Sequence, residues 1–187
     1  MVVLVGFMGA GKTTVGSLLA DRLGLPFLDT DPVIESRAGR PIREIFATDG
    51  EPAFRALEHE VTADLLQGQD AVIALGGGGV EHPATRRCLA GRQVVYLRVG
   101  YEEAMLRVSR DDNRPMLHRP DLNVILRRRQ SNYEAVATQI VATGGRRPEA
   151  ISLDIIKRLV RMPSVSGAIT PVLMPCADGT CGDRAPG

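Results

Sequence analysis

Residues 2–13 read VVLVGFMGAGKT, an apolar run followed by a glycine-rich loop that ends in Lys-Thr. The run Val2–Val5 is typical of a strand buried on both faces of a parallel sheet. After the loop, the spacing of the apolar residues Val15, Leu18, Leu19 and Leu23 predicts a helix. A strand before and a helix after Gly-x-x-x-x-Gly-Lys-Thr are the context that a phosphate-binding loop requires. An accidental glycine-rich turn would not need this context, so we interpret Gly6–Thr13 as a phosphate loop.

The residue types of the phosphate loop suit the binding of a polyphosphate. Its glycines let backbone amides wrap around phosphates, and the following helix adds free amides and the positive end of its dipole. Lys12 supplies a mobile positive charge near a transferred phosphoryl group, and the Thr13 hydroxyl can ligate Mg²⁺. We therefore expect a nucleotide to bind with Mg²⁺ against Gly9, Ala10, Gly11, Lys12, Thr13 and Thr14.

The overall composition excludes several classes of protein. With 187 residues, of which 44% are hydrophobic and 24% charged, the chain is expected to form one main globular domain. A net charge of +1 provides no electrostatic reason to expect a nucleic acid or an anionic membrane as a partner. The chain starts with a predicted core strand in place of a leader, and no apolar stretch approaches the ~20 residues that span a bilayer, so we expect a cytoplasmic protein. Its three cysteines are too few for a disulfide framework or a four-ligand zinc site.

Strand and helix signals alternate along the rest of the chain. Further strands are predicted over residues 26–29, 71–75, 94–97 and 139–142, and further helices over 32–38, 42–47, 51–67, 102–110, 121–136 and 148–161. This alternation predicts an α/β fold with a five-stranded parallel sheet covered by helices on both faces. From residue 163 the Pro, Gly and Ser content rises and periodicity ends. We therefore expect a single domain over residues 1–162 and a disordered tail over residues 163–187.

Two aspartates follow the second predicted strand directly. Asp29 and Asp31 should lie at the carboxyl end of the sheet, where open α/β sheets bind ligands. One carboxylate can hold Mg²⁺, directly or through water, and the other can accept a hydrogen bond from the hydroxyl that attacks a γ-phosphate. Alternatively, Asp31 caps the helix that begins at Pro32, and one residue can fill both roles.

Two further features are compatible with ligand binding, and each has a plain structural alternative. Arg55 precedes Glu58 by three residues, so the two share a helix face, where an exposed ion pair would contribute about 0.2–0.5 kcal/mol. The run Gly76–Gly79 closes the third strand, where backbone amides can approach a ligand without side chains in the way. A flexible turn is the alternative for the glycines.

Taken together, these motifs resemble those of shikimate kinases. The resemblance covers about residues 1–160 and rests on the order and spacing of Gly6–Thr13, Asp29-Thr30-Asp31, Phe54-Arg55 with Glu58, Gly76-Gly77-Gly78, Arg114-Pro115, and Arg129 with Tyr133. It implies a fold like that of the P-loop nucleoside-monophosphate kinases, with an acceptor-binding region at about residues 32–61 and a mobile lid at about residues 111–121. It also implies Mg²⁺-dependent transfer of the γ-phosphoryl group of ATP to the 3-hydroxyl of shikimate, a step of aromatic amino acid biosynthesis, by a monomer with small-molecule substrates.

The resemblance implies roles for the acceptor side. Asp29 would support Mg²⁺ and Asp31 would contact the acceptor hydroxyl. Arg55 and Arg129 would hold the substrate carboxylate, for which planar guanidinium groups are well suited, and Gly77 and Gly78 would contact the substrate. Without the resemblance, Arg129 in a run of three arginines is typical of a solvated helix face.

The resemblance also implies roles on the nucleotide side. Arg114 of the lid would close over the phosphates and would complete the catalytic set with Lys12 and Asp31. The chain has no tryptophan to stack on adenine, and arginine can cover a base face instead. The family places such arginines at positions that match Arg110 and Arg146.

Two other functions are compatible with a phosphate loop. One is a kinase of the same architecture for another small metabolite, such as gluconate. The other is a nucleotide-dependent switch, which the sequence disfavours because no Asn-Lys-x-Asp guanine signature occurs in it. A switch would bind GTP tightly and hydrolyse it slowly without any small acceptor, whereas turnover with gluconate only would indicate the other kinase.

Overall fold

The computed structural model describes residues 1–108 and 122–161. The expected lid at residues 111–121, which contains Arg114, lies outside the described residues, as do Arg110 and the expected tail at residues 163–187. All other candidate site residues lie within them.

Five parallel strands form one sheet in the order β2-β3-β1-β4-β5. Their bounds are Val2–Val5 for β1, Phe27–Asp29 for β2, Val72–Ala74 for β3, Gln93–Arg98 for β4 and Gln139–Ala142 for β5. β1 lies at the centre, where Val3 is in register with Ile73 of β3 and with Val94 of β4. Every residue of β1 and β3 is buried, as expected for apolar strands covered on both faces. The predicted five-stranded parallel sheet is confirmed.

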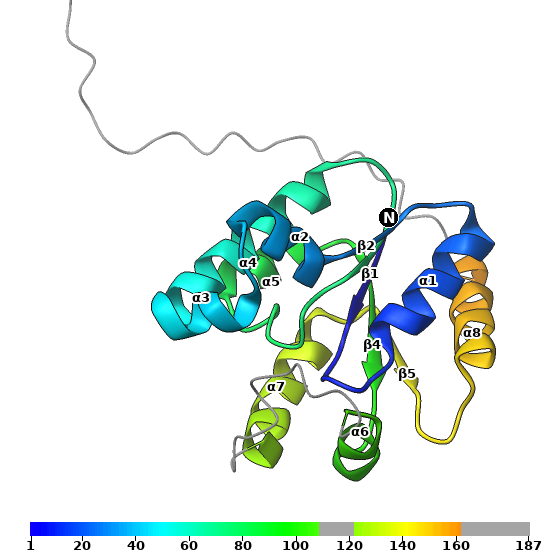
Figure 1. Ribbon diagram of the computed structural model, residues 1–187. Coiled ribbons are helices and arrows are strands. Elements are labelled where there is room, and N and C mark those ends of the chain that lie inside the picture. The colour runs from blue at the N-terminus through cyan, green and yellow to red at the C-terminus, as the bar shows by residue number, and fades with distance from the viewer. Residues whose placement is uncertain (109–121, 162–187) are drawn as a thin grey trace, which may run out of the picture.

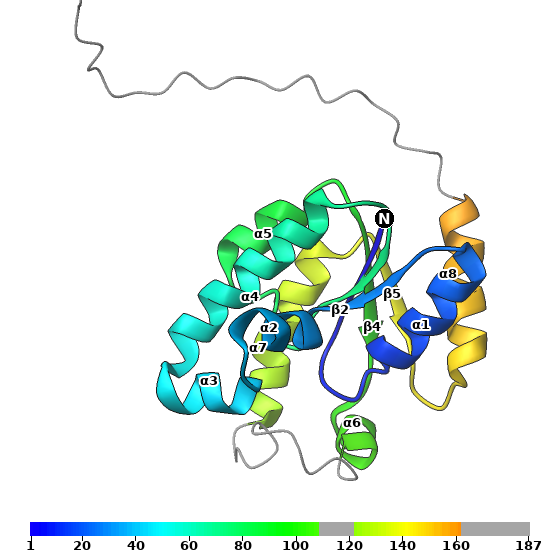
Figure 2. The same ribbon diagram turned by 45° about the horizontal axis from the view of Figure 1, so that its top comes forward.

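Helices cover both faces of this sheet (Figure 1). On one face, α1 (Lys12–Leu23) packs beside α8 (Pro148–Arg161). The opposite side carries α4 (Gly50–Gln67), α5 (Pro83–Leu89) and α7 (Leu122–Val136), and Figure 2 shows the same division from another direction. The predicted α/β layering is therefore confirmed.

A small lobe with its own apolar core projects from the second side. It consists of α2 (Thr30–Ala38), α3 (Ile42–Thr48) and α4 as far as Val61. Ile34, Ile45, Phe54 and Val61 form a buried cluster there that is distinct from the main core of the sheet. This lobe spans the residues that were expected to bind the acceptor.

Two sequence-based expectations about helices are corrected by the structure. No helix was predicted between β3 and β4, yet α5 begins at Pro83 and buries Thr85 and Leu89, four residues apart. Its sequence, PATRRCL, contains few apolar residues and so shows no clear helical period. Second, α2 begins before Pro32, because the Asp29 carboxylate accepts a hydrogen bond of 3.2 Å from the amide of Asp31. Asp29 is therefore the N-cap, and the alternative that Asp31 caps this helix is wrong.

The carboxyl edge of the sheet gathers the candidate residues. The phosphate loop follows β1, Asp29 ends β2, and the run Gly76–Gly79 follows β3. α6 (Tyr101–Val108) follows β4 and lies near the same edge (Figure 1). Within the two described ranges, no helix is both long and apolar enough to cross a membrane.

Candidate active site

The backbone of the phosphate loop requires glycine at several positions, Gly9 and Gly11 among them. Gly9 has a φ of 73°, and a Cβ atom at this residue would lie 2.6 Å from the carbonyl oxygen of Ala104. Gly11 has a φ of 88° and is the N-cap of α1. No side chain of the described residues caps this helix start. The first amides of α1 are therefore available to an anion such as a phosphate group.

Lys12 holds its ammonium group over the loop. Its Nζ donates hydrogen bonds to the carbonyl oxygens of Gly6 and Phe7, at 2.9 and 3.2 Å. Ala10 is buried inside the loop, whereas Thr14 is exposed on the first turn of α1. The loop thus combines a fixed backbone with a charged side chain that can exchange carbonyl partners for phosphate oxygens.

Thr13 and Asp29, the two expected metal ligands, are in contact with each other. The Thr13 hydroxyl donates a hydrogen bond of 2.8 Å to Oδ2 of Asp29. Mg²⁺ prefers oxygen ligands and usually keeps waters and substrate phosphates beside one or two protein carboxylates. Among the described residues no group of three or more His, Cys, Asp or Glu side chains could enclose a metal by itself. This hydroxyl and carboxylate beside the phosphate loop therefore fit a Mg²⁺ ion that the nucleotide would help to hold.

Asp31 lies against the glycine run that follows β3. A Cβ atom on Gly76 would lie 2.8 Å from Oδ1 of Asp31 and 2.7 Å from Oε1 of Glu58. The amide of Gly76 also donates a hydrogen bond of 2.9 Å to Oγ1 of Thr30. Gly76 therefore leaves room for two carboxylates at one point of the sheet edge.

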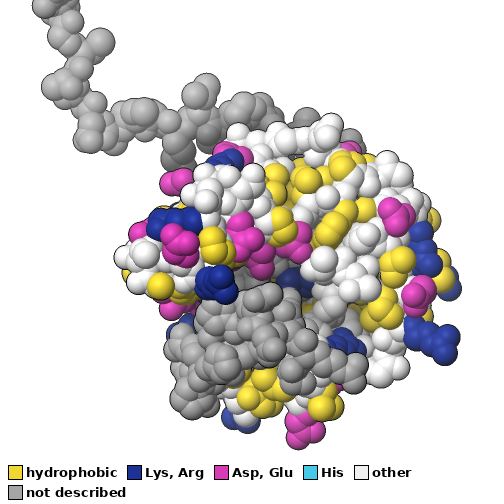
Figure 3. Space-filling model, viewed as in Figure 1, with side chains coloured by type: hydrophobic (Ala, Val, Ile, Leu, Met, Phe, Trp, Pro, Cys, Tyr) yellow, Lys and Arg dark blue, Asp and Glu magenta, His cyan; other side chains and the backbone are white. Residues whose placement is uncertain are grey.

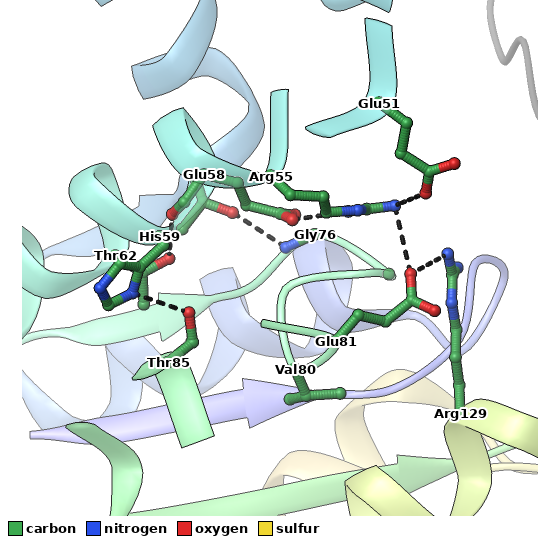
Figure 4. Close-up of polar contacts among 12 residues, drawn as sticks. Glu51, Arg55, Glu58, His59, Thr62, Gly76, Val80, Glu81, Thr85 and Arg129 are labelled. Atoms are coloured by element: carbon green, nitrogen blue, oxygen red, sulfur yellow. Dashed lines mark hydrogen bonds and ion pairs between the residues drawn. The ribbon is translucent and has the colours of Figure 1, made fainter. Parts of the chain in front are cut away.

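Arg55 is only slightly exposed and pairs with a buried glutamate, so the two do not form an exposed ion pair. Its side chain is 13% exposed and that of Glu58 is 3% exposed, with 2.6 Å between Nη1 and Oε2. Its Nη2 lies 3.2 Å from Glu51 and 3.3 Å from Glu81 (Figure 4). The exposed-pair alternative is therefore wrong.

Burial and charge shift the pKa values of this pair. Burial lowers the pKa of the Arg55 guanidinium, but the charge of Glu58 and its hydrogen bond outweigh burial and leave the pKa raised. Burial raises the pKa of the Glu58 carboxyl, and Arg55 offsets only part of this effect. Burial of the Arg55–Glu58 pair therefore carries a desolvation penalty, which the attraction between the two groups must offset.

Arg129 of α7 is also buried, with a side chain 3% exposed. Its Nη2 donates a hydrogen bond of 2.7 Å to Oε2 of Glu81. Arg127 and Arg128 beside it are exposed, so a solvated helix face describes its neighbours and not Arg129. One turn further along α7, burial raises the pKa of the Tyr133 hydroxyl, which donates a hydrogen bond to the carbonyl oxygen of Gly77.

The two buried arginines keep unused hydrogen-bond donors. The Nε atoms of Arg55 and Arg129 are buried, and no described residue accepts a hydrogen bond from them. Gly78 lies directly against Arg55, since a Cβ atom on Gly78 would be 2.1 Å from Nη1. Gly77 is closer to the other arginine, because a Cβ atom there would be 3.9 Å from Nη1 of Arg129. The glycines and arginines thus form one cluster that could receive a planar anion.

Arg146 was expected to contact the nucleotide, and Arg107, which the sequence did not reveal, lies against the phosphate loop. Arg146 is a third exposed and bonds to the carbonyl oxygen of Ala142 and to Asp154. Arg107 of α6 bonds to the carbonyl oxygens of Gly9, at 3.1 Å, and Thr143, at 3.0 Å. Arg107 therefore links the phosphate loop to the segment after β5. The spacing of Glu103 and Arg107 on one helix face was the available signal, and it indicates no more than an ion pair.

Glu81 is the other residue that the sequence did not reveal. It follows the glycine run and lies in ion-pair distance of Arg55, Arg128 and Arg129. No periodicity or motif marks it. Acidic side chains also gather near the middle of the face seen in Figure 3, with Lys or Arg side chains beside them.

Comparison with known proteins identifies relatives over most of the chain. The family model for shikimate kinase matches residues 8–160. A shikimate kinase from Thermobifida fusca is 48% identical over 162 residues, which cover 85% of this chain and 94% of that protein. A shikimate kinase from Mycobacterium tuberculosis is 44% identical over 172 residues, or 90% of this chain and 97% of that protein.

Solved structures of shikimate kinases share the fold. A shikimate kinase from Acinetobacter baumannii in complex with shikimate has a TM-score of 0.80 and 36% identity, over 85% of this chain and 92% of that one. The enzyme from Aquifex aeolicus has a TM-score of 0.76 and 33% identity, over 85% and 95% of the two chains. A gluconokinase from Sinorhizobium meliloti, at 18% identity and a TM-score of 0.50, is similar in fold alone.

Proposed function

Because the chain belongs to the shikimate kinase family, we propose that it transfers the γ-phosphoryl group of ATP to the 3-hydroxyl of shikimate, giving shikimate 3-phosphate and ADP. The related Acinetobacter baumannii protein has been solved with shikimate bound. In this chain, the observation that supports a carboxylate acceptor best is the pair of buried arginines with unused Nε donors. A guanidinium binds a carboxylate through parallel hydrogen bonds, and such charged bonds are about twice as strong as neutral ones.

The described residues divide the work of the reaction between two sides. Asp31 would accept a hydrogen bond from the acceptor hydroxyl and direct its oxygen toward the γ-phosphorus. As the bond between the acceptor oxygen and the γ-phosphorus forms, the bond from the γ-phosphorus to the bridging oxygen of ADP breaks, and the hydroxyl proton would pass to Asp31. Lys12 would leave the carbonyl oxygens of Gly6 and Phe7 and donate to the phosphates. Arg55 and Arg129 would fix the far end of the acceptor and so limit the reacting geometry.

The metal and the remaining arginines complete this proposal. Thr13 and Asp29 would hold Mg²⁺, which neutralises charge on the β- and γ-phosphate oxygens when bound. We propose that Arg107 belongs to the nucleotide side together with Arg146, because it bonds directly to the phosphate-loop backbone. The roles of Arg110 and Arg114 remain those that the family resemblance implies.

A coupled assay of ADP release tests the proposed function. The protein is incubated with ATP and Mg²⁺, with shikimate, with gluconate, or with no acceptor, and each reaction is repeated in excess EDTA. We expect ADP release that depends on both shikimate and Mg²⁺. ADP release with gluconate but not with shikimate would show that the protein is a kinase with an acceptor other than shikimate. Tight nucleotide binding without acceptor-dependent release would favour a nucleotide-dependent switch.

We also propose that the protein acts in the cytoplasm as a monomer. ATP and a small carboxylate acceptor are metabolites of that compartment, and the monomer is what the family resemblance implies. Sedimentation equilibrium of the purified protein tests the oligomeric state. A mass near 20.1 kDa is expected, and a mass of twice that value would contradict the monomer.

A further inference from the structure

Glu81 places a carboxylate between the two arginines of the acceptor side. Its Oε2 atom lies 2.7 Å from Nη2 of Arg129 and 3.3 Å from Nη2 of Arg55. The two guanidinium groups come from α7 and α4, and the glutamate comes from the segment after β3 (Figure 4). One carboxylate oxygen thus joins two arginines that are remote from each other in sequence.

The other glutamates near Arg55 do not share this position. Glu51 pairs with Arg55 from the half-exposed outer side, at 3.2 Å. Glu58 is buried and pairs with Nη1 of Arg55, while its other oxygen faces Gly76. Of these three glutamates, Glu81 is the one that also contacts Arg129. Its carboxylate therefore makes the kind of contact that an acceptor carboxylate would make.

Charge shows why the two carboxylates would compete. Arg55, Arg128 and Arg129 carry three positive charges, and Glu51, Glu58 and Glu81 carry three negative charges. Asp31 lies beside Glu58 and adds a fourth negative charge. The arginine charges are therefore already balanced before an acceptor arrives, and an arriving carboxylate would add a further negative charge at close range, where like charges repel. Glu81 also makes an outward contact, since its Oε1 lies 2.5 Å from Arg128, whose side chain is 66% exposed.

We propose that Glu81 is a specificity-determining residue that occupies the acceptor-carboxylate position between Arg55 and Arg129 in the ligand-free protein and yields it when an acceptor carboxylate arrives. This inference rests on the proposed function. Glu81 turns outward with Arg128, and the acceptor carboxylate takes its hydrogen bonds on both buried arginines. The apparent affinity for the acceptor is then reduced by the fraction of protein in which Glu81 still occupies the site. An acceptor without a carboxylate has no equivalent bonds to offer and does not displace Glu81.

The test compares Glu81→Gln with Glu51→Gln. Both substitutions remove one negative charge that lies within 3.3 Å of the same Nη2 atom of Arg55, but only Glu81 also contacts Arg129. We expect Glu81→Gln to lower KM for shikimate by about three- to tenfold, with kcat and KM for ATP within about twofold of the wild type. Glu51→Gln should change KM for shikimate by less than about twofold. Titration calorimetry with shikimate in the absence of ATP should show the same order of affinities.

Other outcomes would overturn the proposal. An unchanged KM in Glu81→Gln would mean that Glu81 does not compete, and a raised KM would mean that it holds the arginines in place for the acceptor. If the wild type neither binds nor phosphorylates shikimate, both the proposed function and the competition by Glu81 are rejected. If the wild type phosphorylates shikimate but Glu81→Gln does not bind it more tightly, only the competition by Glu81 is rejected. Glu81→Ala, checked for folding by its unfolding midpoint, serves as the second variant and should change KM in the same direction.

Discussion

The phosphate loop and the proposed acceptor side, which comprises Arg55, Arg129 and the glycine run, are built in different ways. The loop is one continuous segment, Gly6–Thr13, whose shape depends on glycine dihedral angles and on the helix that follows it. The acceptor side joins α4, α7 and the segment after β3, and its Glu81–Arg129 bond spans 48 residues. Its charged side chains are also largely buried, so each depends on its partners. Substitutions in the loop should therefore act mainly on chemistry and nucleotide binding, and those on the acceptor side should act on affinity and stability together.

The largest effect is expected at Asp31, where the two sides meet. We expect Asp31→Asn to lower kcat by about 10²–10⁴-fold, because the amide cannot accept the proton of the attacking hydroxyl as a carboxylate does. The affinity for ATP should change little. Steady-state kinetics and nucleotide titration measure the two effects. An unchanged kcat would show that Asp31 takes no part in the chemical step.

Arg55→Ala should weaken both the affinity for the acceptor and the stability of the protein. We expect KM for shikimate to rise by about 10- to 100-fold, since a charged hydrogen bond contributes about 1.5–3 kcal/mol. The variant should also lose about 3–5 kcal/mol of unfolding free energy, because Glu58 stays buried without its partner. Kinetics and urea unfolding measure the two losses.

The double variant Arg55→Ala/Glu58→Gln separates these losses. It removes the uncompensated charge, so part of the stability should return while KM stays high. Recovery of KM along with stability would show that Arg55 acts through folding and not through the acceptor. An effect confined to KM for ATP would contradict the placement of Arg55.

Gly78→Ala should disturb the acceptor side by a steric clash alone, without a change of charge. A Cβ atom at Gly78 would lie 2.1 Å from Nη1 of Arg55, so the guanidinium must shift. We expect KM for shikimate to rise by about tenfold, since small displacements of a positioning group are costly. Gly100→Ala is the control, because a Cβ atom there meets nothing within 4 Å and its φ lies outside the left-handed region. Equal effects of the two substitutions would mean that steric pressure on Arg55 is not the cause.

Arg107→Ala should act on the nucleotide side only. Arg107 is a third exposed and bonds to the backbone of Gly9, so we expect KM for ATP to rise by about two- to fivefold and KM for shikimate to stay constant. Arg158→Ala is a matched control. Arg158 also pairs with an acidic residue four positions earlier and bonds to a backbone carbonyl, but it does so on α8. An effect of similar size in both variants would exclude a specific role for Arg107.

The smallest expected effect concerns the dependence of stability on pH. Burial raises the pKa of Glu58 above 4.5, so the wild type should lose stability relative to Glu58→Gln as the pH rises above that value. Burial also raises the pKa of Glu81, but the hydrogen bonds and charges of Arg129, Arg128 and Arg55 outweigh it and hold the pKa below 4.5. Relative to Glu81→Gln, the wild type should therefore lose stability as the pH falls below that value. Urea unfolding from pH 3.5 to 7 measures both slopes, and slopes of the same sign would contradict this assignment.

Much of the fold could be predicted because its signals are local. The strand Val2–Val5 and the helices at 51–67 and 148–161 were found within a residue of their observed bounds, since hydrophobic period and length suffice for long elements. The helix Pro83–Leu89 was missed because two buried residues do not establish a period. The start of α2 was misplaced because the choice between Asp29 and Asp31 as the cap depends on backbone geometry.

By itself, the sequence determined the phosphate loop, the alternation of strands and helices, and the order of the shikimate kinase motifs, because each is encoded by residue types at short spacing. Only the tertiary structure decided which charged residues are buried and which of them meet. It buried Arg129 while leaving Arg128 exposed, and it placed Glu81 between two arginines from separate helices. These outcomes depend on how α4, α7 and the segment after β3 pack together, and a contact between residues far apart in sequence leaves no periodic signal in the chain.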